Sequence, residues 1–151
     1  MVFSARTPLM ACVLLVLTTS PSQAQITNFS QDVNQSINDG IDWLTAQGAF
    51  NAASSAGQAA GLVALALLEK PRSADQNALP QGYQDAIADD QARIQRVIRY
   101  IINQSNLSFY AYRDGANMMA LAVYLRTGGP DQNDAMNALN RIFDRTVQNQ
   151  N

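Results

Sequence analysis

Apolar residues recur at steps of three and four along most of this chain, which is the spacing of one face of an α-helix. No segment alternates apolar and polar residues at every second position, as a half-buried strand would. The pattern therefore predicts an all-α fold without strands. Ser30 is the expected N-cap of the first helix. Five helices are expected, over about residues 31–47, 56–70, 84–104, 114–127 and 132–148.

The expected helices alternate in character. The first, third and fifth carry an apolar stripe on one face, whereas the second and fourth are apolar nearly all round, as in Gly61–Leu68 and Met118–Leu125. A helix that is apolar on every side is expected to be buried on every side. Arg93, Arg96 and Arg99 fall off the stripe of the third helix and are expected to point outward.

Residues 1–24 have the pattern of a secretory signal peptide. Arg6 precedes an apolar run from Leu9 to Leu17, and Ser22-Gln23-Ala24 places small residues at the −3 and −1 positions of a cleavage site. A buried N-terminal helix is the alternative, and Pro21 argues against it. The sequence predicts cleavage after Ala24 and an exported protein, periplasmic or extracellular, whose domain spans residues 25–151.

The composition excludes several classes of site. The chain has no histidine, and its one cysteine, Cys12, lies inside the predicted leader. A Ser-His-Asp triad, a histidine base and a His- or Cys-ligated zinc site are therefore excluded from the mature chain. The net charge of −2 becomes −3 when Arg6 leaves with the leader, which argues against a nucleic-acid binder. We expect no cofactor and no membrane span after cleavage.

The chain also shows an internal similarity. Trp43-Leu44-Thr45-Ala46-Gln47 aligns with residues 100–104 at an offset of 57, and Ala64–Leu68 aligns with Ala120–Tyr124 at an offset of 56. This similarity predicts stacked helix hairpins, in which each pair is unstable alone. It also predicts a shared structural role for Trp43 and Tyr100. The alternative is two unrelated hairpins in an ordinary helical bundle.

A helix that ends in an aromatic residue and Gln, followed by a loop, Gly and an Ala/Leu-rich helix, resembles the α/α-toroid family. That family includes squalene-hopene cyclases and protein prenyltransferase β subunits and carries the prenyltransferase/squalene oxidase repeat. The matching segments are 37–47 with 57–68 and 97–104 with 115–125. The resemblance implies a terpenoid-cyclase-like arrangement of inner and outer helices.

The sequence lacks the catalytic and metal-binding residues of that family. The Asp-x-Asp-Asp motif of the cyclases is absent, and the nearest acidic pair, Asp89-Asp90, stands at a helix start, where carboxylates usually act as caps or dipole partners. The prenyltransferases of that family hold zinc through Asp, Cys and His, and the mature chain has neither Cys nor His. Two helix pairs and one further helix cannot close a toroid. The chain therefore resembles a short, motif-lacking member or a fragment.

The best candidate for a binding site lies around the start of the fourth helix. Tyrosine, arginine, aspartate and asparagine can bind a polar or sugar-like ligand by stacking and hydrogen bonds. The alternative, which we favour, is loop packing with an Arg113–Asp114 cap. The candidate residues are Tyr110, Tyr112, Arg113, Asp114 and Asn117.

Two functions fit these observations. The first is an exported, non-catalytic α/α repeat module that binds a partner or ligand. The second is the N-terminal fragment of a secreted enzyme similar to terpenoid cyclases or prenyltransferases. Two helix pairs cannot enclose all their apolar surface, so we expect self-association or docking on a protein partner.

Overall fold

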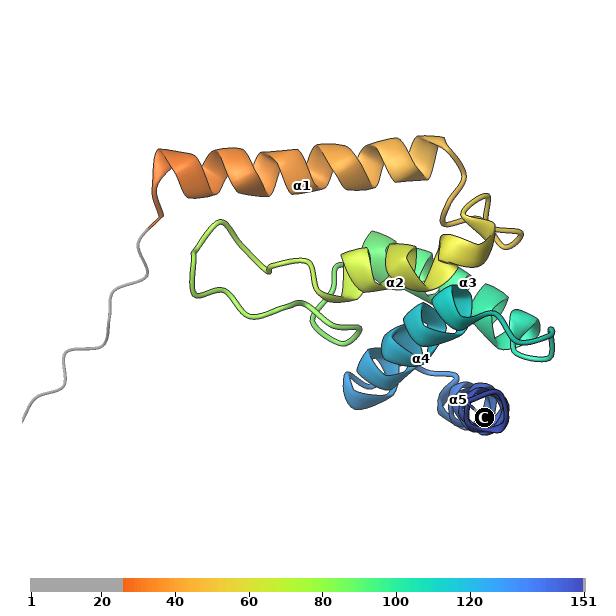
Figure 1. The fold of residues 1–151 in the computed structure, drawn as a ribbon. Helices are drawn as coiled ribbons and strands as arrows, with labels where there is room; N and C mark the ends of the chain where they lie inside the picture. The colour runs from red at the N-terminus through yellow and green to blue at the C-terminus, as the bar shows by residue number, and fades with distance from the viewer. Residues whose placement is uncertain (1–25, 151) are drawn as a thin grey trace, which may run out of the picture.

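The computed structural model describes residues 26–150, and these fold into α-helices without a strand, as the sequence predicted (Figure 1). The predicted leader, residues 1–24, lies outside the described residues. The elements are α1 (Asn28–Ala46), the short 3₁₀-helix η1 (Gly57–Ala59), α2 (Ala60–Leu68), α3 (Ala88–Gln104), α4 (Ala111–Arg126) and α5 (Gln132–Gln148).

Four of the five helices begin at residues other than the expected ones. α1 begins at Asn28 instead of residue 31, and α2 begins at Ala60, after η1, instead of residue 56. Thr27, not Ser30, caps α1, because the two residues form a reciprocal capping box in which the Ser30 N–H donates to Thr27 Oγ1 at 3.1 Å. α3 begins at Ala88 instead of residue 84. α4 begins at Ala111, three residues earlier than expected. Tyr112 and Arg113, which were expected before the helix, therefore lie in its first turn.

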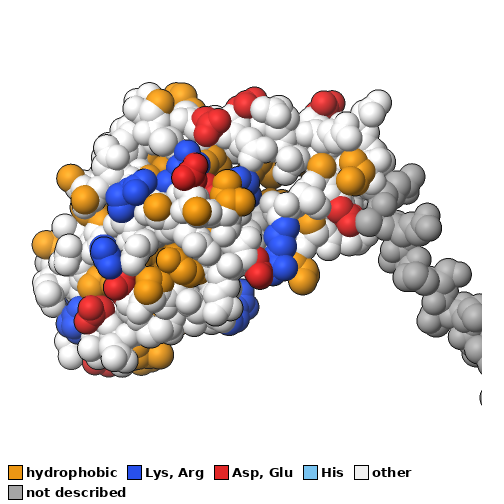
Figure 2. Space-filling view, turned by 180° about the vertical axis from the view of Figure 1, so that it is seen from behind, with side chains coloured by type: hydrophobic (Ala, Val, Ile, Leu, Met, Phe, Trp, Pro, Cys, Tyr) orange, Lys and Arg blue, Asp and Glu red, His pale blue; other side chains and the backbone are white. Residues whose placement is uncertain are grey.

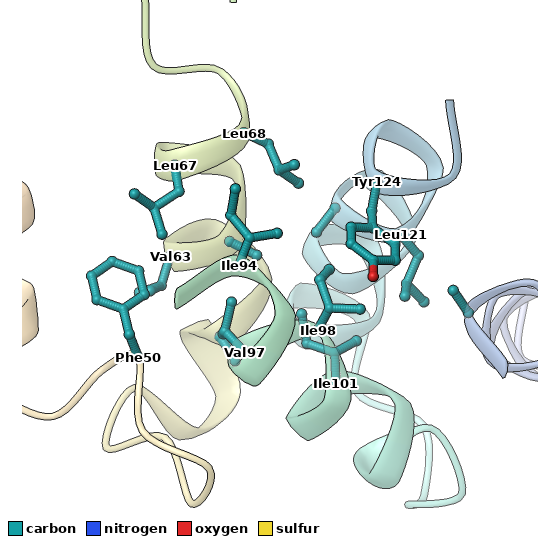
Figure 3. Packing of buried hydrophobic residues seen from close by; sticks show 14 of the residues in the cluster. Phe50, Val63, Leu67, Leu68, Ile94, Val97, Ile98, Ile101, Leu121 and Tyr124 are labelled. Carbon is teal, nitrogen blue, oxygen red and sulfur yellow. The ribbon is translucent and has the colours of Figure 1, made fainter. Parts of the chain in front are cut away.

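The centre of the fold is the contact between α2 and α4, with α3 packed on α2 and α5 packed on α4. The two central helices approach closely at Gly61, where a Cβ atom would lie 2.4 Å from the carbonyl carbon of Ala116. Figure 3 shows side chains of α2, α3 and α4, among them Leu67, Ile98 and Leu121, gathered into one cluster. Glycine at position 61 thus sets how close the two helices can lie.

The prediction that α2 and α4 are buried on every side was wrong. Leu62 of α2 and Met119 of α4 are exposed, although their neighbours Val63 and Ala120 are buried. The physical reason is that α3 and α5 cover only part of each central helix. Arg96 and Arg99 remain at the surface but bind neighbouring segments: Arg96 donates to the Phe50 carbonyl at 2.9 Å, and Arg99 pairs with Asp131 at 3.0 Å.

α1 lies apart from the other helices (Figure 1). Among the helices it packs only against α2, over a short stretch, and its only buried residues are Ser30 and Ile41. One ion pair, 4.0 Å long, connects its Asp42 to Arg93 of α3. α1 is therefore the least embedded helix of the fold.

Candidate functional site

The start of α4 separates the five predicted site residues into two groups. Arg113, Asp114 and Asn117 are buried on one side of the helix, whereas Tyr110 and Tyr112 are exposed, Tyr112 by 73%. Successive helical residues are rotated by about 100°, so residues 113, 114 and 117 share a face that residue 112 does not. The structure thus brings together three of the predicted residues and leaves both tyrosines in solvent.

Asp114 is fully buried and binds three neighbours. Its carboxylate accepts hydrogen bonds from Arg113 Nε at 2.9 Å, Arg145 Nε at 3.0 Å and the Tyr110 backbone N–H at 3.2 Å. Burial alone would raise the pKa of this carboxyl, but the bonds from Arg145, Tyr110 and Arg113 together hold the pKa below its usual value. These contacts fit the cap and packing role that we favoured from the sequence.

Arg145 and Arg141 connect α5 to the turn between α3 and α4. Arg145 Nη1 donates to the Ser105 carbonyl at 2.7 Å, and Arg141 Nη2 donates to Ser105 Oγ at 2.7 Å. Arg113 and Arg145 therefore share the single carboxylate of Asp114, so this buried cluster has an excess of positive charge. The sequence indicated the Arg113–Asp114 pair but not the arginines of α5, because these are far from it along the chain.

A small cavity of about 120 Å³ lies beside this cluster, at the end of the molecule where η1 and α4 begin. Asn117 lines it and is only 2% exposed, and its side-chain oxygen Oδ1 has no hydrogen-bond partner among the described residues. Buried polar atoms are nearly always paired, so an unpaired one needs an explanation. The lining residues, of which the sequence suggested only the last two as site residues, are Gly57, Gln58, Tyr100, Gln104, Leu107, Arg113 and Asn117.

The expectation that Trp43 and Tyr100 share a structural role was wrong. Tyr100 is half-buried and lines this cavity, whereas Trp43 is exposed and lines a different one. The reason is that α3 lies in the packed part of the fold and α1 does not. Tyr100 therefore belongs to the candidate site.

A larger apolar groove runs between α1 and the segment from α2 to residue 78. It consists of two cavities of about 540 and 290 Å³ that share Ile37 and Pro71. The α1 residues Phe29 and Val33 line one cavity, and Gly40 lines the other. We call this feature the α1 groove.

Asp90 forms a second buried ionic cluster. Its carboxylate lies 3.0 Å from Lys70 Nζ, 3.0 Å from Arg93 Nη1 and 3.2 Å from Gln81 Nε2, and the residue is fully buried. The neighbouring Asp89 is exposed. The role expected for a carboxylate at a helix start was a cap or a dipole partner. The structure instead shows Asp90 joining the end of α2 to the start of α3.

Comparison with known proteins gave no match to a family model, to a curated protein or to a solved structure. Among residues 26–150, no three His, Cys, Asp or Glu side chains are grouped so that they could hold a metal ion. In the same range, no helix has the length and apolar character needed to cross a membrane.

Proposed function

We propose that this chain is an exported, non-catalytic helical-repeat module that binds protein, and that its first partner is a second copy of itself. The observation that carries the proposal is the α1 groove, an apolar surface that the described chain leaves open. An open apolar groove beside a helix is the kind of surface into which the apolar face of a partner helix docks. The proposal rests on the repeat interpretation of the helices.

The repeat indicates what the α1 groove lacks. At the offset of 57, Ile37, Ile41 and Leu44 of α1 correspond to Ile94, Ile98 and Ile101 of α3. All three α3 residues are fully buried, because α3 packs on α2 and also contacts α4 and α5. Of the α1 residues only Ile41 is buried. A further helix packed against α1 would bury its apolar stripe as neighbouring helices bury that of α3.

The opposite end of the molecule offers such a helix. α5 buries Ala135, Ala138 and Ile142 against its neighbours, and a second stripe faces away from them. Met136, Phe143 and Val147 are exposed, and Leu139 between them is half-buried. The steps of three and four residues place these side chains on one face, which is the arrangement of a helix that docks in a groove. We call Met136, Leu139, Phe143 and Val147 the α5 stripe.

We infer that the α5 stripe of one copy enters the α1 groove of the next. The two surfaces differ, so the contact is head-to-tail and each bound copy still has one free end. Stacking of this kind continues the helical repeat from copy to copy. Figure 2 shows acidic side chains along the upper edge of the molecule, where α1 lies.

Sedimentation of the mature protein, residues 25–151, at increasing micromolar concentrations tests this assembly. Gly40→Glu places a charge in the groove where a Cβ atom meets nothing within 4 Å, and Phe143→Glu places one on the stripe. Each variant alone should stay monomeric. An equimolar mixture should form a dimer and nothing larger, because one intact surface remains on each partner.

Met119→Glu is the matched control, since Met119 is exposed on α4 and lies outside both surfaces. It should assemble like the wild type. A wild-type monomer at every concentration, or a mixture of variants that fails to pair, would contradict the proposal. Mass spectrometry of the exported protein tests the leader separately, with Gln25 as the expected first residue.

A further inference from the structure

We propose that the cavity beside Asn117 binds a short carboxylate of the size of acetate. Its volume is about 120 Å³, and a water molecule takes up roughly 30 Å³ in the liquid, so the cavity holds about four non-hydrogen atoms. Acetate has that number, whereas a sugar ring has more. The cavity shares no lining residue with the α1 groove or the α5 stripe, so the proposal stands independently of the assembly.

The cavity borders a cluster with an excess of positive charge. Asp114 and Ser105 are bound by three arginines, which are Arg113, Arg141 and Arg145. Asp114 is the only carboxylate that pairs with them among the described residues, so three cations against one carboxylate leave an excess of two positive charges. The cluster also has a surplus hydrogen-bond donor, because Nη2 of Arg145 is buried without a partner. Buried charges are stabilised by opposite charges, so the cluster favours an anion over a neutral ligand.

Two donors in the wall of the cavity are free to bind such an anion. Arg113 is only 6% exposed; its Nε binds Asp114 and its Nη2 binds the Ser108 carbonyl, but its Nη1 makes no hydrogen bond with the described residues. The side chain of Asn117 has no partner in that range either. Of the unpaired side-chain atoms in these two residues, only Oδ1 of Asn117 lacks accessible surface, so Nη1 of Arg113 and Nδ2 of Asn117 can be reached. An arginine N–H and an amide N–H thus remain to donate to the two oxygens of a carboxylate.

The other walls suit the rest of this ligand. Leu107 and the ring of Tyr100 offer apolar surface against which a methyl group can pack. The amides of Gln58 and Gln104 are further N–H donors. No carboxylate of the described residues lines the cavity, so its wall carries no negative charge that would repel the ligand. Chloride would balance the charge of the cluster but would leave the apolar part of the cavity unfilled.

Separate titrations of the full mature chain with sodium acetate and sodium chloride, followed by two-dimensional NMR, test the proposal. The buffer contains only large sulfonate anions, and the two salts are compared at equal ionic strength. The guanidinium signals of Arg113 and the side-chain amide signals of Asn117 should shift together and saturate at millimolar acetate. Chloride should shift them less, because it contacts fewer of the lining groups. Equal shifts with chloride, or no shift with acetate, would overturn the assignment of a carboxylate ligand.

Charge changes at the cavity separate binding from folding. Gln58 is an exposed residue of η1, so Gln58→Glu should weaken acetate binding several-fold and Gln58→Lys should strengthen it, both at an unchanged melting temperature. Gln31→Glu makes the same charge change at an exposed position of α1, outside the cavity, and should bind acetate like the wild type. Asn117→Leu should also weaken binding, because it removes one of the two free donors. Acetate binding by Gln58→Glu that is as tight as binding by Gln31→Glu would contradict the proposed site.

Discussion

α1 and α3 are built from similar sequence but occupy different environments. Both carry isoleucines at four-residue steps, Ile37 and Ile41 in α1 and Ile94 and Ile98 in α3. α3 is surrounded by other helices and its stripe is fully buried, whereas α1 contacts only α2 among the helices. An apolar stripe therefore indicates that one face of a helix is stabilised by burial. Whether that face is buried within the same chain depends on the elements that pack around the helix.

The largest difference in unfolding free energy is expected between the alanine variants of Asp90 and Asp42, which both pair with Arg93. Asp90 is buried between Lys70 and Arg93, so Asp90→Ala leaves two cations without their partner and should cost about 3 kcal/mol of unfolding free energy. Asp42 of α1 is exposed and 4.0 Å from the same arginine, so Asp42→Ala should cost well under about 1 kcal/mol. Urea unfolding measures both. Equal costs would show that α1 is as tightly integrated as α3.

A smaller difference in unfolding free energy is expected between the alanine variants of Ile94 and Ile37, which correspond in the repeat. Ile94 is fully buried, and Ile94→Ala should cost about 2–4 kcal/mol through lost contacts and a residual cavity. Ile37 lines the open α1 groove, so Ile37→Ala should cost about 1 kcal/mol or less in dilute protein. Chemical denaturation at low protein concentration is the measurement. A cost for Ile37→Ala as large as that for Ile94→Ala would mean that the groove is filled in solution.

Alanine substitutions at two helical glycines, Gly61 and Gly40, should change the stability of the fold in opposite directions. At Gly61 a Cβ atom would meet the α4 backbone at 2.4 Å, so Gly61→Ala should force α2 and α4 apart and cost about 1–3 kcal/mol. At Gly40 of α1 nothing lies within 4 Å, so Gly40→Ala should stabilise the helix by about 0.5–1 kcal/mol. Melting temperatures report both. A stabilising Gly61→Ala would contradict the close helix contact.

The helices could be predicted from sequence because periodicity and caps are local signals. α5 was predicted at its observed bounds, whereas α1 begins three residues and ends one residue earlier than predicted. The start of α4 was not predictable in this way. Tyr110 precedes the helix in an extended conformation, and its N–H is bound by the side chain of Asp114 from inside the first turn. No Ser, Thr, Asn or Asp stands at the capping position, so the usual signal was missing.

The candidate site could be predicted only in part, for a different reason. The sequence singled out Arg113 and Asn117 because polar residues stand out beside an apolar helix. Gln58, Tyr100 and Gln104 reach the same cavity through the packing of η1, α3 and α4, which no local pattern encodes. The unpaired oxygen of Asn117 is likewise a property of the packed structure. Tertiary contacts therefore supplied the residues that sequence reasoning missed.

The smallest effects on stability are expected for substitutions of the N-cap residues of α5 and α1. Asp131, the N-cap residue of α5, pairs with Arg99 of α3 at 3.0 Å, and hydrogen bonding to Arg99 holds the pKa of Asp131 below its usual value. A carboxyl whose folded pKa is lowered adds stability above its unfolded pKa, and that stability is lost as the pH falls through the folded pKa. Asp131→Asn should therefore be slightly less stable than the wild type at neutral pH and equal to it in acid. Thr27→Ala removes the neutral cap of α1, so its small cost should not change with pH. Thermal melts between neutral and acidic pH compare the two, and a gap for Asp131→Asn that persists in acid would show that its contribution comes from packing and not from charge.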